Sequence, residues 1–382
     1  MNLVFAVIPE KGHINPYIGP AQALAARGHQ VTVIAPGDIS GQINAAGLFF
    51  APDLVPRETG SRPTHGAELV ELIQDSSRLA AWIEQLLLTD IPPQVELLRD
   101  CYKRLAAHVV VIDPLYYPAA IAAHAENIPW ASVSNSLNPV LPPQLDSALI
   151  RTTRALSSRR AAIFKEYGAH PSFSSADVLS PYLNIAFTRE ELCGPVPNVE
   201  LVGPSFPLNE RGDEVPLQPL PADRPIVYAS FGSQIYHWPE IFAKLQKLDV
   251  HLVLSAGELV HQIEPSENCQ IYRYAPQRAI LEHAGVFITH GGANSFMEAI
   301  AAGVPMLLSP MCNDQFHQAY FLERCGIGIA ADLRTMNDSE LAAAVRTLLA
   351  DGLHRTAMAQ ISKSYQGNGA LRAAALIEGL GA

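Results

Sequence analysis

The stretch ITHGGANSFMEAIAAGVP (residues 288–305) decides the predicted fold. An apolar run over 286–289 predicts a buried strand, a Gly-Gly turn follows, and a helical pattern begins near Ser295. Gly291 and Gly292 can adopt positive φ and let backbone amides approach a ligand closely. A helix that follows such a turn offers free N–H groups and the positive end of its dipole. The stretch therefore predicts a strand–turn–helix unit with a phosphate site.

The residues around this turn support two interpretations. His290, at the end of the strand, can donate a hydrogen bond to a phosphate oxygen. Ser295 and Glu298 also fit the capping-box pattern, in which they would only stabilise the helix terminus. The sequence has no G-x-x-x-x-G-K-[S/T] motif and no G-x-G-x-x-G after its first strand. These absences argue against a P-loop NTPase and against a dinucleotide-dependent dehydrogenase.

The same alternation of strand, turn and helix continues in both directions along the chain. Short apolar runs end in Pro, Gly or Asn, and helix-like segments such as 18–28 and 295–303 lie between them. Because the runs are continuous rather than alternating, they predict parallel strands with helices on both faces, in an α/β fold of two doubly wound sheets. The runs lie at 3–9, 30–36, 108–114, 129–135, 183–188 and 199–204, and at 225–232, 250–257, 269–276, 285–292 and 304–310.

A stretch rich in proline and charge separates the two halves. Residues 205–225 follow neither a helical nor a strand period, so they predict a linker. We expect a first Rossmann-like domain over 1–204, a linker over 205–224, a second Rossmann-like domain over 225–355, and C-terminal helices over 356–382 that cross back to the first domain. Two such domains that face each other would place their carboxyl-edge loops around a central cleft.

Composition limits the partners and the compartment. With 37 acidic and 26 basic residues among 382, the net charge of -11 argues against nucleic acid as a partner. No apolar run approaches the ~18–20 residues of a spanning helix. The first apolar stretch stops at Pro9 without a basic leader, which predicts no signal peptide. The five cysteines form no C-x-x-C pair, so we expect reduced thiols and a cytoplasmic location.

One basic segment departs from this acidic composition. Residues 151–165 predict a solvated helix face, and the alternative is contact with a membrane surface or an acidic partner. Its cations are Arg151, Arg154, Arg159, Arg160 and Lys165.

Residues 274–315, which read YAPQRAIL…VFITHGGANSFMEAIAAGVPMLLSPMCNDQ, resemble the donor-binding signature of the UDP-glycosyltransferase-like family. A weaker similarity extends over nearly the whole chain and includes GHINP (12–16) and YASFGS (228–233). The resemblance implies the GT-B fold and an inverting hexosyl transfer that needs no metal and no cofactor. UDP-glucose is the expected donor, and a TDP-sugar is the alternative.

The resemblance also implies which residues hold the nucleoside. Tyr274 stands where the family places an aromatic residue, usually Trp, that stacks on the base. From the residues alone, Tyr274 is equally well a packing tyrosine. Ala275 and Gln277 would lie beside the base and ribose, and Glu298 would hold the ribose hydroxyls.

A second set of residues would hold the diphosphate. His290 would bind it with help from the amides around Gly292, Asn294 and Ser295. Ser233, after the SFG of the first turn in this domain, would approach the same phosphates.

A third set would hold the transferred sugar. Asp314 and Gln315 follow a predicted strand, and an acid beside an amide suits the recognition of several hydroxyls. Asn313-Asp314 is also ordinary helix N-cap chemistry. Gly12 would let its turn approach the sugar. Gly291 and Ala293 stand where plant members carry Cys and Trp, which is typical of bacterial members and leaves uracil and thymine both open as the donor base.

The catalytic residues implied by the resemblance are His13 and Asp113. His13 matches the general base of the GHINP turn, and Asp113 of VVVIDP matches the aspartate that orients it. A neutral imidazole can take the proton of an acceptor hydroxyl while the glycosidic bond forms, and a carboxylate stabilises the imidazolium and fixes its tautomer. The residues alone also allow His13 as a turn residue and Asp113 as a helix cap.

The acceptor is the least defined part of the prediction. Residues 134–143 (SNSLNPVLPP) form an irregular apolar loop, and 60–95 have helical apolar spacing; both either line a pocket or pack the core. SVSNSLNP is similar to the corresponding loop of carotenoid glycosyltransferases. We expect the acceptor to be a hydrophobic or aromatic small molecule with a free hydroxyl; O-transfer is the default, and C- and N-transfer are the alternatives. The candidate contacts are Trp82, Tyr116, Asn135 and Leu137.

Two other functions stay open at this point. A GT-B-fold sugar-nucleotide epimerase would need carboxylates near the sugar but not the His13–Asp113 pair. A non-catalytic nucleotide-sugar-binding subunit would bind the donor without transfer. A monomer and a homodimer are both compatible with the sequence.

Overall fold

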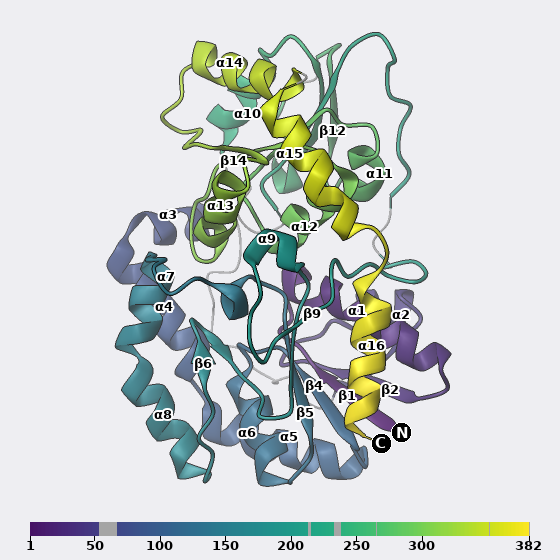
Figure 1. Cartoon of the computed structure of the whole chain (residues 1–382), viewed down its shortest axis with the longest axis vertical. Coiled ribbons are helices and arrows are strands. Elements are labelled where there is room, and N and C mark those ends of the chain that lie inside the picture. Colours follow the sequence, from purple (N-terminus) through teal and green to yellow (C-terminus); the bar gives the residue numbers. More distant parts are fainter. Residues whose placement is uncertain (53–66, 213–214, 233–237, 265, 351, 382) are drawn as a thin grey trace. The chain divides into compact units, whose positions relative to one another are not determined.

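The chain forms two compact units in the computed structural model, which describes residues 1–52, 67–212, 215–232, 238–264, 266–350 and 352–381 (Figure 1). Unit 1 comprises Met1–Ser61, Ser76–Asp213 and Gly367–Ala382. Unit 2 comprises Arg62–Asp75 and Glu214–Gln366.

Unit 1 contains a parallel sheet of seven strands in the order β3-β2-β1-β4-β5-β8-β9. The chain starts in the middle of this sheet, so the strand order reverses between β1 and β4. In sheets of this kind ligands bind at the carboxyl ends of the strands beside such a reversal. The strands are β1 (Asn2–Ala6), β2 (Gln30–Ile34), β3 (Phe49–Phe50), β4 (Val109–Ile112), β5 (Trp130–Ser134), β8 (Leu183–Ala186) and β9 (Glu200–Leu201).

Helices and one small hairpin complete unit 1. The antiparallel hairpin consists of β6 (Phe173–Ser174) and β7 (Asp177–Val178). The helices are α1 (Lys11–Ala26), α2 (Ser40–Ala45), α4 (Ser76–Leu88), α5 (Ile91–Arg104), α6 (Tyr117–Ala125), the 3-10 turn η2 (Asn138–Val140), α7 (Ala148–Ala155), α8 (Ser157–Glu166), α9 (Glu190–Cys193) and α16 (Gly369–Leu380).

Unit 2 repeats the arrangement with six parallel strands in the order β12-β11-β10-β13-β14-β15. Its order reverses between β10 and β13. The strands are β10 (Ile226–Ser230), β11 (His251–Ser255), β12 (Cys269–Tyr272), β13 (Val286–Thr289), β14 (Met306–Leu308) and β15 (Gly328–Ala330). The helices are α3 (Ala67–Gln74), α10 (Pro239–Leu245), η3 (Gly257–His261), α11 (Gln277–Leu281), α12 (Ala293–Ala302), α13 (Gln315–Arg324), α14 (Asp338–Leu349), α15 (Leu353–Ser362) and η4 (Lys363–Tyr365).

All eleven predicted strands are present, and the predicted fold class of two doubly wound parallel sheets is confirmed. The first helix differs from its prediction. Residues 9–16 were expected as a turn, with the helix from 18, but α1 begins at Lys11. His13 therefore lies in the first turn of a helix and not in a loop.

Pro16 and Pro20 lie inside α1. A proline nitrogen cannot donate to the carbonyl four residues earlier, so the carbonyls of Gly12 and Pro16 lose their helical partner. Side chains from elsewhere in unit 1 take their place: Asn135 Nδ2 donates to Gly12 O at 3.2 Å, and Ser205 Oγ donates to Pro16 O at 2.7 Å. Both prolines therefore tie α1 to neighbouring segments.

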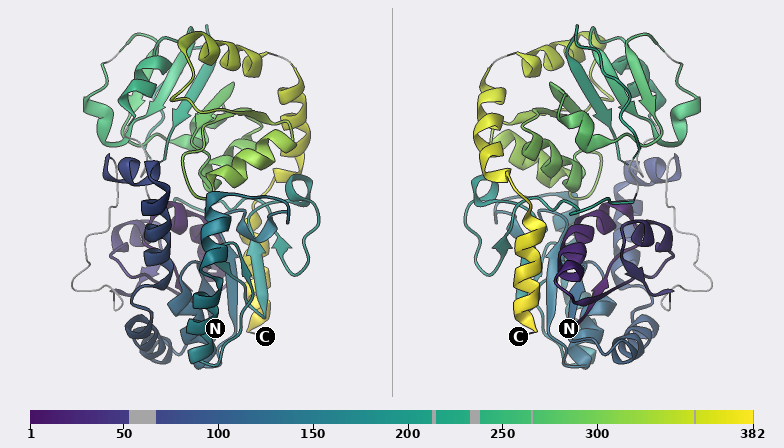
Figure 2. Two further views of the ribbon diagram at one scale, coloured as in Figure 1. Left: turned by 90° about the vertical axis from the view of Figure 1, so that its left-hand side faces the viewer. Right: turned by 90° about the vertical axis from the view of Figure 1, so that its right-hand side faces the viewer.

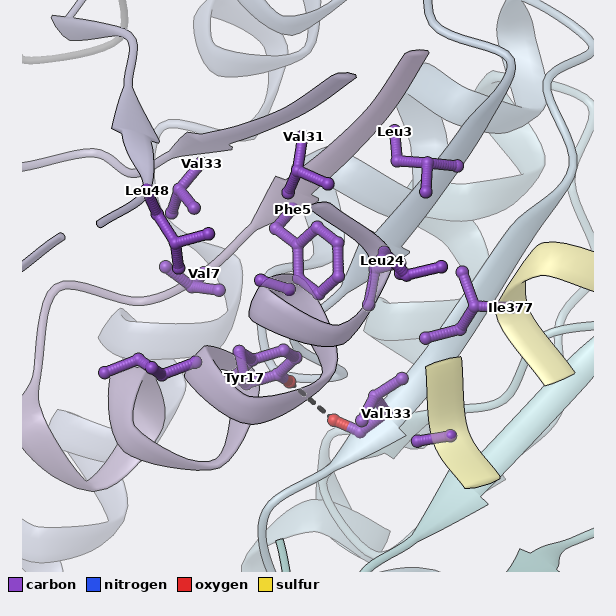
Figure 3. Packing of buried hydrophobic residues seen from close by; sticks show 14 of the residues in the cluster. Leu3, Phe5, Val7, Tyr17, Leu24, Val31, Val33, Leu48, Val133 and Ile377 are labelled. Atoms are coloured by element: carbon purple, nitrogen blue, oxygen red, sulfur yellow. Dashed lines mark hydrogen bonds between the residues drawn. The ribbon is translucent and has the colours of Figure 1, made fainter. Parts of the chain in front are cut away.

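The core of unit 1 lies between sheet and helices and includes the end of the chain (Figure 3). The rings of Phe5 and Tyr17 meet edge to face with centroids 6.5 Å apart, and Tyr17 OH donates to the Val133 carbonyl at 2.5 Å. Ile377 of α16 belongs to the same buried cluster. α16 packs against α1 and against strands of the sheet, and the two termini lie close together (Figures 1 and 2).

The segments at the unit boundaries bond to their own unit. Phe206 N donates to Asn368 Oδ1 at 3.0 Å within unit 1, so part of the predicted linker packs on this unit. Gln218 N donates to Tyr272 OH at 2.9 Å within unit 2. The chain returns to unit 1 between α15 and α16. The acceptor and donor roles of the units stay predictions.

A substitution at Gly19 tests how closely α1 packs against Phe206 and α16. A Cβ at Gly19 would lie 2.2 Å from the Phe206 carbonyl oxygen and 2.8 Å from the Ala370 Cβ. We expect Gly19→Ala to lower the free energy of unfolding by about 3 kcal/mol, because backbone must move to relieve the clash. Gly12→Ala on the same helix meets open space and is the control, with an effect within about 1 kcal/mol in urea titration. Equal stability of both variants would contradict the close approach.

Among the described residues, none of the helices has the length and apolar character that a membrane crossing requires.

Candidate active site

His13 and Asp113 meet at the strand reversal of unit 1. β1 and β4 are neighbours, and Asp113 N donates to the Ala6 carbonyl at 3.0 Å where the two strands end. The His13 Nδ1 atom lies 2.6 Å from Asp113 Oδ2. The Asp113 carboxylate is fully buried, whereas 19% of the His13 side chain is exposed. The two predicted residues are therefore in direct contact, with the imidazole at the surface of the unit.

Asp113 does not cap a helix. α6 begins at Tyr117 with Tyr116 at its N-cap position, and Asp113 Oδ1 instead accepts from Leu115 N at 3.1 Å. This bond and the contact with His13 use both carboxylate oxygens. A carboxylate beside Nδ1 favours the tautomer with the proton on Nδ1, which makes Nε2 the basic nitrogen of the ring.

The four predicted acceptor residues lie in different surroundings. Asn135 is half-buried, and its side chain bonds to Gly12 next to His13. Tyr116 and Leu137 are buried, with 5% and 0% exposed, so both pack in unit 1. Trp82 is half-buried on α4. The hydrogen bond of Asn135 thus reaches the helix of His13.

In unit 2, Gln277, Ser295 and Glu298 form one hydrogen-bonded cluster. Gln277 Nε2 donates to Glu298 Oε2 at 2.6 Å and to Ser295 Oγ at 3.1 Å. Tyr228 OH donates to Gln277 Oε1 at 3.3 Å. The capping-box interpretation is wrong, because α12 begins at Ala293 with Gly292 as its N-cap residue. Ser295 and Glu298 lie inside the helix, three residues apart, and turn one face towards Gln277.

His290 lies at the strand reversal of unit 2, enclosed by glycines. A Cβ at Gly232, which has φ +79°, would lie 2.8 Å from His290 Cε1, and a Cβ at Gly292 would lie 2.9 Å from Nε2. Gly291 has φ +87°. The first amides of α12 follow directly, and such amides lack acceptors inside their helix. His290 Nδ1 is a buried nitrogen without a hydrogen-bond partner among the described residues.

The His290 imidazole is neutral at physiological pH. Burial lowers the pKa of this side chain to about 4, and the nearby carboxylate of Asp314 opposes the shift only in part. A neutral imidazole keeps one N–H group that can donate a hydrogen bond.

This pKa predicts a pH-dependent stability. The folded pKa lies below the value of about 6.5 for an unfolded histidine, so the unfolded chain binds the proton first as the pH falls. His290 has no effect above pH 6.5, and between pH 6.5 and 4 it lowers the free energy of unfolding by up to roughly 3 kcal/mol. We expect His290→Gln to lose this component in urea titrations at several pH values. Parallel curves for wild type and variant would contradict the shifted pKa.

Asp314 ends the loop after β14, and Gln315 is the first residue of α13. Asp314 is the N-cap residue of α13, but its side chain makes no capping bond; Oδ2 accepts from Gln318 Nε2 at 2.9 Å. The Gln315 side chain is buried, and its Oε1 accepts from Met311 N at 2.7 Å and Cys312 N at 3.1 Å. The Gln315 side chain thus shapes the loop that precedes α13. Asp314 is half-buried.

The remaining predicted donor residues are partly described. Tyr274 is half-buried with the guanidinium of Arg273 5.8 Å from its ring centroid, and Ala275 N donates to Ser255 Oγ at 3.3 Å. Asn294 is half-buried in the first turn of α12. Ser233 lies outside the described residues.

His317 and Gln318 were not identified from the sequence as buried polar neighbours of Asp314. Both are fully buried on α13, and the charge of Asp314 acts on His317, whose pKa burial lowers. Their spacing of three and four residues from Asp314 places them on one helical face, which was a usable signal. The described part of the chain contains no cluster of three or more His, Cys, Asp or Glu side chains suited to a metal ion, and metal independence stays a prediction.

The basic segment 151–165 is only partly solvated. Arg159 pairs with Glu84 and Arg151 with Asp146 at the surface. Arg160 is buried, so the prediction of a solvated face is wrong for this residue. Contact of the exposed cations with a membrane or an acidic partner stays a prediction.

Comparison with known proteins places the chain in a family. The family model for UDP-glucoronosyl and UDP-glucosyl transferase matches residues 92–368. The chain is 27% identical to NDP-glycosyltransferase YjiC of Bacillus subtilis (strain 168), covering 97% of this chain and 95% of that protein. It is 26% identical to zeaxanthin glucosyltransferase of Pantoea ananas, covering 98% and 95%.

Solved structures show the same fold. The glycotransferase of kitacinnamycin superimposes with a TM-score of 0.78 at 24% identity, covering 99% of this chain and 98% of the other. Glycosyltransferase VinC in complex with dTDP superimposes with a TM-score of 0.68 at 18% identity, covering 100% and 99%. The fold is that of the GT-B glycosyltransferases, and the chain belongs to the UDP-glucoronosyl and UDP-glucosyl transferase family of enzymes that use nucleotide sugars.

Proposed function

We propose that the chain transfers a hexose, with inversion, from UDP-glucose to a hydroxyl of a hydrophobic small molecule, with His13 as general base and Asp113 as its orienting residue. The observation that carries the proposal is the 2.6 Å contact between His13 Nδ1 and the buried Asp113 carboxylate at a strand reversal. Such an arrangement suits removal of a proton from a hydroxyl that binds near Nε2.

In the proposed step, the acceptor oxygen forms a bond to the anomeric carbon from the face opposite the nucleotide. The bond from that carbon to the phosphate oxygen breaks, and UDP leaves with the electron pair. The hydroxyl proton passes to His13 Nε2. The departing diphosphate is stabilised by the N-terminal amides of α12 and by neutral His290 as a hydrogen-bond donor.

The Gln277–Ser295–Glu298 cluster and the relatives support the proposed donor and acceptor. The Gln277–Ser295–Glu298 cluster offers a buried carboxylate for ribose hydroxyls. The zeaxanthin glucosyltransferase among the relatives supports glucose as the sugar and a hydrophobic acceptor, whereas the VinC complex with dTDP makes a TDP-sugar the alternative donor. The relatives are transferases, which does not favour the epimerase or the binding subunit.

A mass-spectrometric screen tests this proposal. Phenolic, polyketide and terpenoid alcohols are incubated with UDP-glucose or TDP-glucose, and products are sought that gained one hexose. The expected product from UDP-α-glucose is a β-glucoside by NMR. An α-glucoside would contradict inversion, epimerised sugar in the absence of acceptor would support the epimerase, and donor binding without any transfer would support the binding subunit.

A further inference from the structure

The β6–β7 hairpin of unit 1 bonds to two loops at the edge of the sheet that carries His13 and Asp113. Val178 N donates to the carbonyl of Pro114, the residue directly after Asp113, at 3.1 Å. The Asp177 carboxylate accepts from Oγ of Ser134, the last residue of β5, at 2.5 Å and from Nδ2 of Asn138, in the 3-10 turn η2 after the strand, at 2.7 Å. The hairpin thus holds the turn after β4 and the loop after β5 together.

The end of β5 and the residue that follows it contact α1 on both sides of Ser134. The Val133 carbonyl accepts from Tyr17 OH at 2.5 Å (Figure 3), and Asn135 Nδ2 donates to Gly12 O at 3.2 Å. The second bond uses the carbonyl that Pro16 leaves without a helical partner, one residue before His13. The position of residues 133–135 therefore fixes the first turns of α1.

Asp177 is the centre of this arrangement. Its side chain is 1% exposed, and Ser134 and Asn138 are 1% and 3% exposed. A buried carboxylate is stable only when its oxygens accept hydrogen bonds, and the bonds from Ser134 and Asn138 reach separate oxygens. Burial and the charges of Asp113 and Asp177 raise the pKa of Tyr17 well above its ordinary value, so Tyr17 stays a neutral donor.

Buried side chains of two helices hold the hairpin in place. Buried Arg160 donates from Nη1 to the Ser175 carbonyl at 2.7 Å, and its guanidinium lies 4.4 Å from the ring centroid of Phe173. Tyr117 OH donates to the Ala176 carbonyl at 2.6 Å. Because these contacts fix the hairpin, the carboxylate of Asp177 can hold the segment 134–138 in place.

We propose that Asp177 is a positioning residue for the base: it holds the segment 134–138, which holds Gly12 and so sets the angle at which His13 meets Asp113. This inference rests on the proposed role of His13 as general base. Asp177 does not touch the reacting atoms.

The test replaces the carboxylate by its isosteric amide. In Asp177→Asn one oxygen becomes an NH2 group, so the side chain can accept from only one of the two donors, Ser134 and Asn138. We expect kcat to fall by about 10- to 100-fold with the KM for the sugar donor unchanged, because a small displacement of the base suffices for such a loss. The imidazole N–H resonance of His13 should also shift in the free protein, a readout that loss of stability alone would not move.

Two further variants complete the design. Ser180→Ala is the matched control, because this buried serine donates to Trp130 O at 2.5 Å at the opposite end of β5; it should lower the melting temperature and leave kcat and the resonance unchanged. The exchange variant Asp177→Asn with Asn138→Asp restores a carboxylate–amide bond and should regain most of the lost kcat.

The outcomes separate this inference from the proposed function. Wild-type kcat and an unshifted His13 resonance in Asp177→Asn would overturn the positioning role, provided that His13→Ala is inactive. An active His13→Ala would overturn the base itself. An exchange variant as slow as Asp177→Asn would overturn the hydrogen-bonded route. If Asp177→Asn does not fold, Ser134→Ala, which removes one of the two bonds, should shift the same resonance and lower kcat less.

Discussion

Replacement of His13 by alanine is expected to lower kcat for glycosyl transfer by about 10²- to 10⁴-fold, the range that a positioned general base contributes. Donor affinity should stay unchanged, because the predicted donor residues that bond to one another, Gln277, Ser295 and Glu298, belong to unit 2. Asp113→Asn should lose activity as well, since an amide can direct its NH2 group at Nδ1 and favour the wrong tautomer. Initial rates measured alongside calorimetric titration with UDP separate the two effects.

His29 provides the matched control. Its Nε2 lies 2.8 Å from Glu378 Oε1, so it forms another histidine–carboxylate pair of unit 1, away from the strand reversal. We expect His29→Ala to keep the wild-type kcat. Turnover by His13→Ala at the wild-type rate would rule out the general-base role.

Replacement of Glu298 by alanine is expected to weaken UDP binding by about 10- to 100-fold. Its carboxylate is buried and bonded to Gln277 at 2.6 Å, and loss of hydrogen bonds to a charged group has about this effect. The variant also leaves the Gln277 amide without this acceptor. Calorimetric titration with UDP measures the change directly.

Exposed Glu282, at the end of α11, is the control for removal of a negative charge from unit 2. Glu282→Ala should bind UDP as tightly as the wild type. A Glu298→Ala variant with unchanged affinity would show that the carboxylate does not hold the ribose.

The sequence predicted the sheets well because buried parallel strands are continuous apolar runs. VVVI of β4 and VFIT of β13 are typical, and each is bounded by turn residues. β3 and β15 were missed because pairs and triplets such as Phe49–Phe50 carry no period. The start of α1 was missed because glycine and proline in GHINP indicate a turn, whereas bonds from Asn135 and Ser205 compensate for both prolines in the helix.

Site residues that belong to a sequence motif could be predicted from the sequence. Residues that only tertiary packing places near the site could not. The contact of His13 with Asp113 joins residues 100 positions apart, and only the family resemblance suggested it. Asp177 lies in a Ser- and Ala-containing stretch without any pattern. Arg160 did carry a signal: Thr153, Leu156 and Phe164 recur with it at helical spacing in the sequence and are buried. Because Arg160 is charged, we predicted it to be exposed and did not count it in the helical spacing of the buried residues.

The return of α16 to unit 1 has a consequence for how the chain is made. Residues 369–380 contribute Ala373, Ala374 and Ile377 to a core whose other members lie before residue 203. During synthesis, which proceeds from the N-terminus, unit 1 therefore waits with an incomplete core while the whole of β10–β15 is translated. Unit 2 can close first, although its strands come second. A chain released shortly before residue 367 would keep an open apolar surface beside α1, a target for chaperones and proteases.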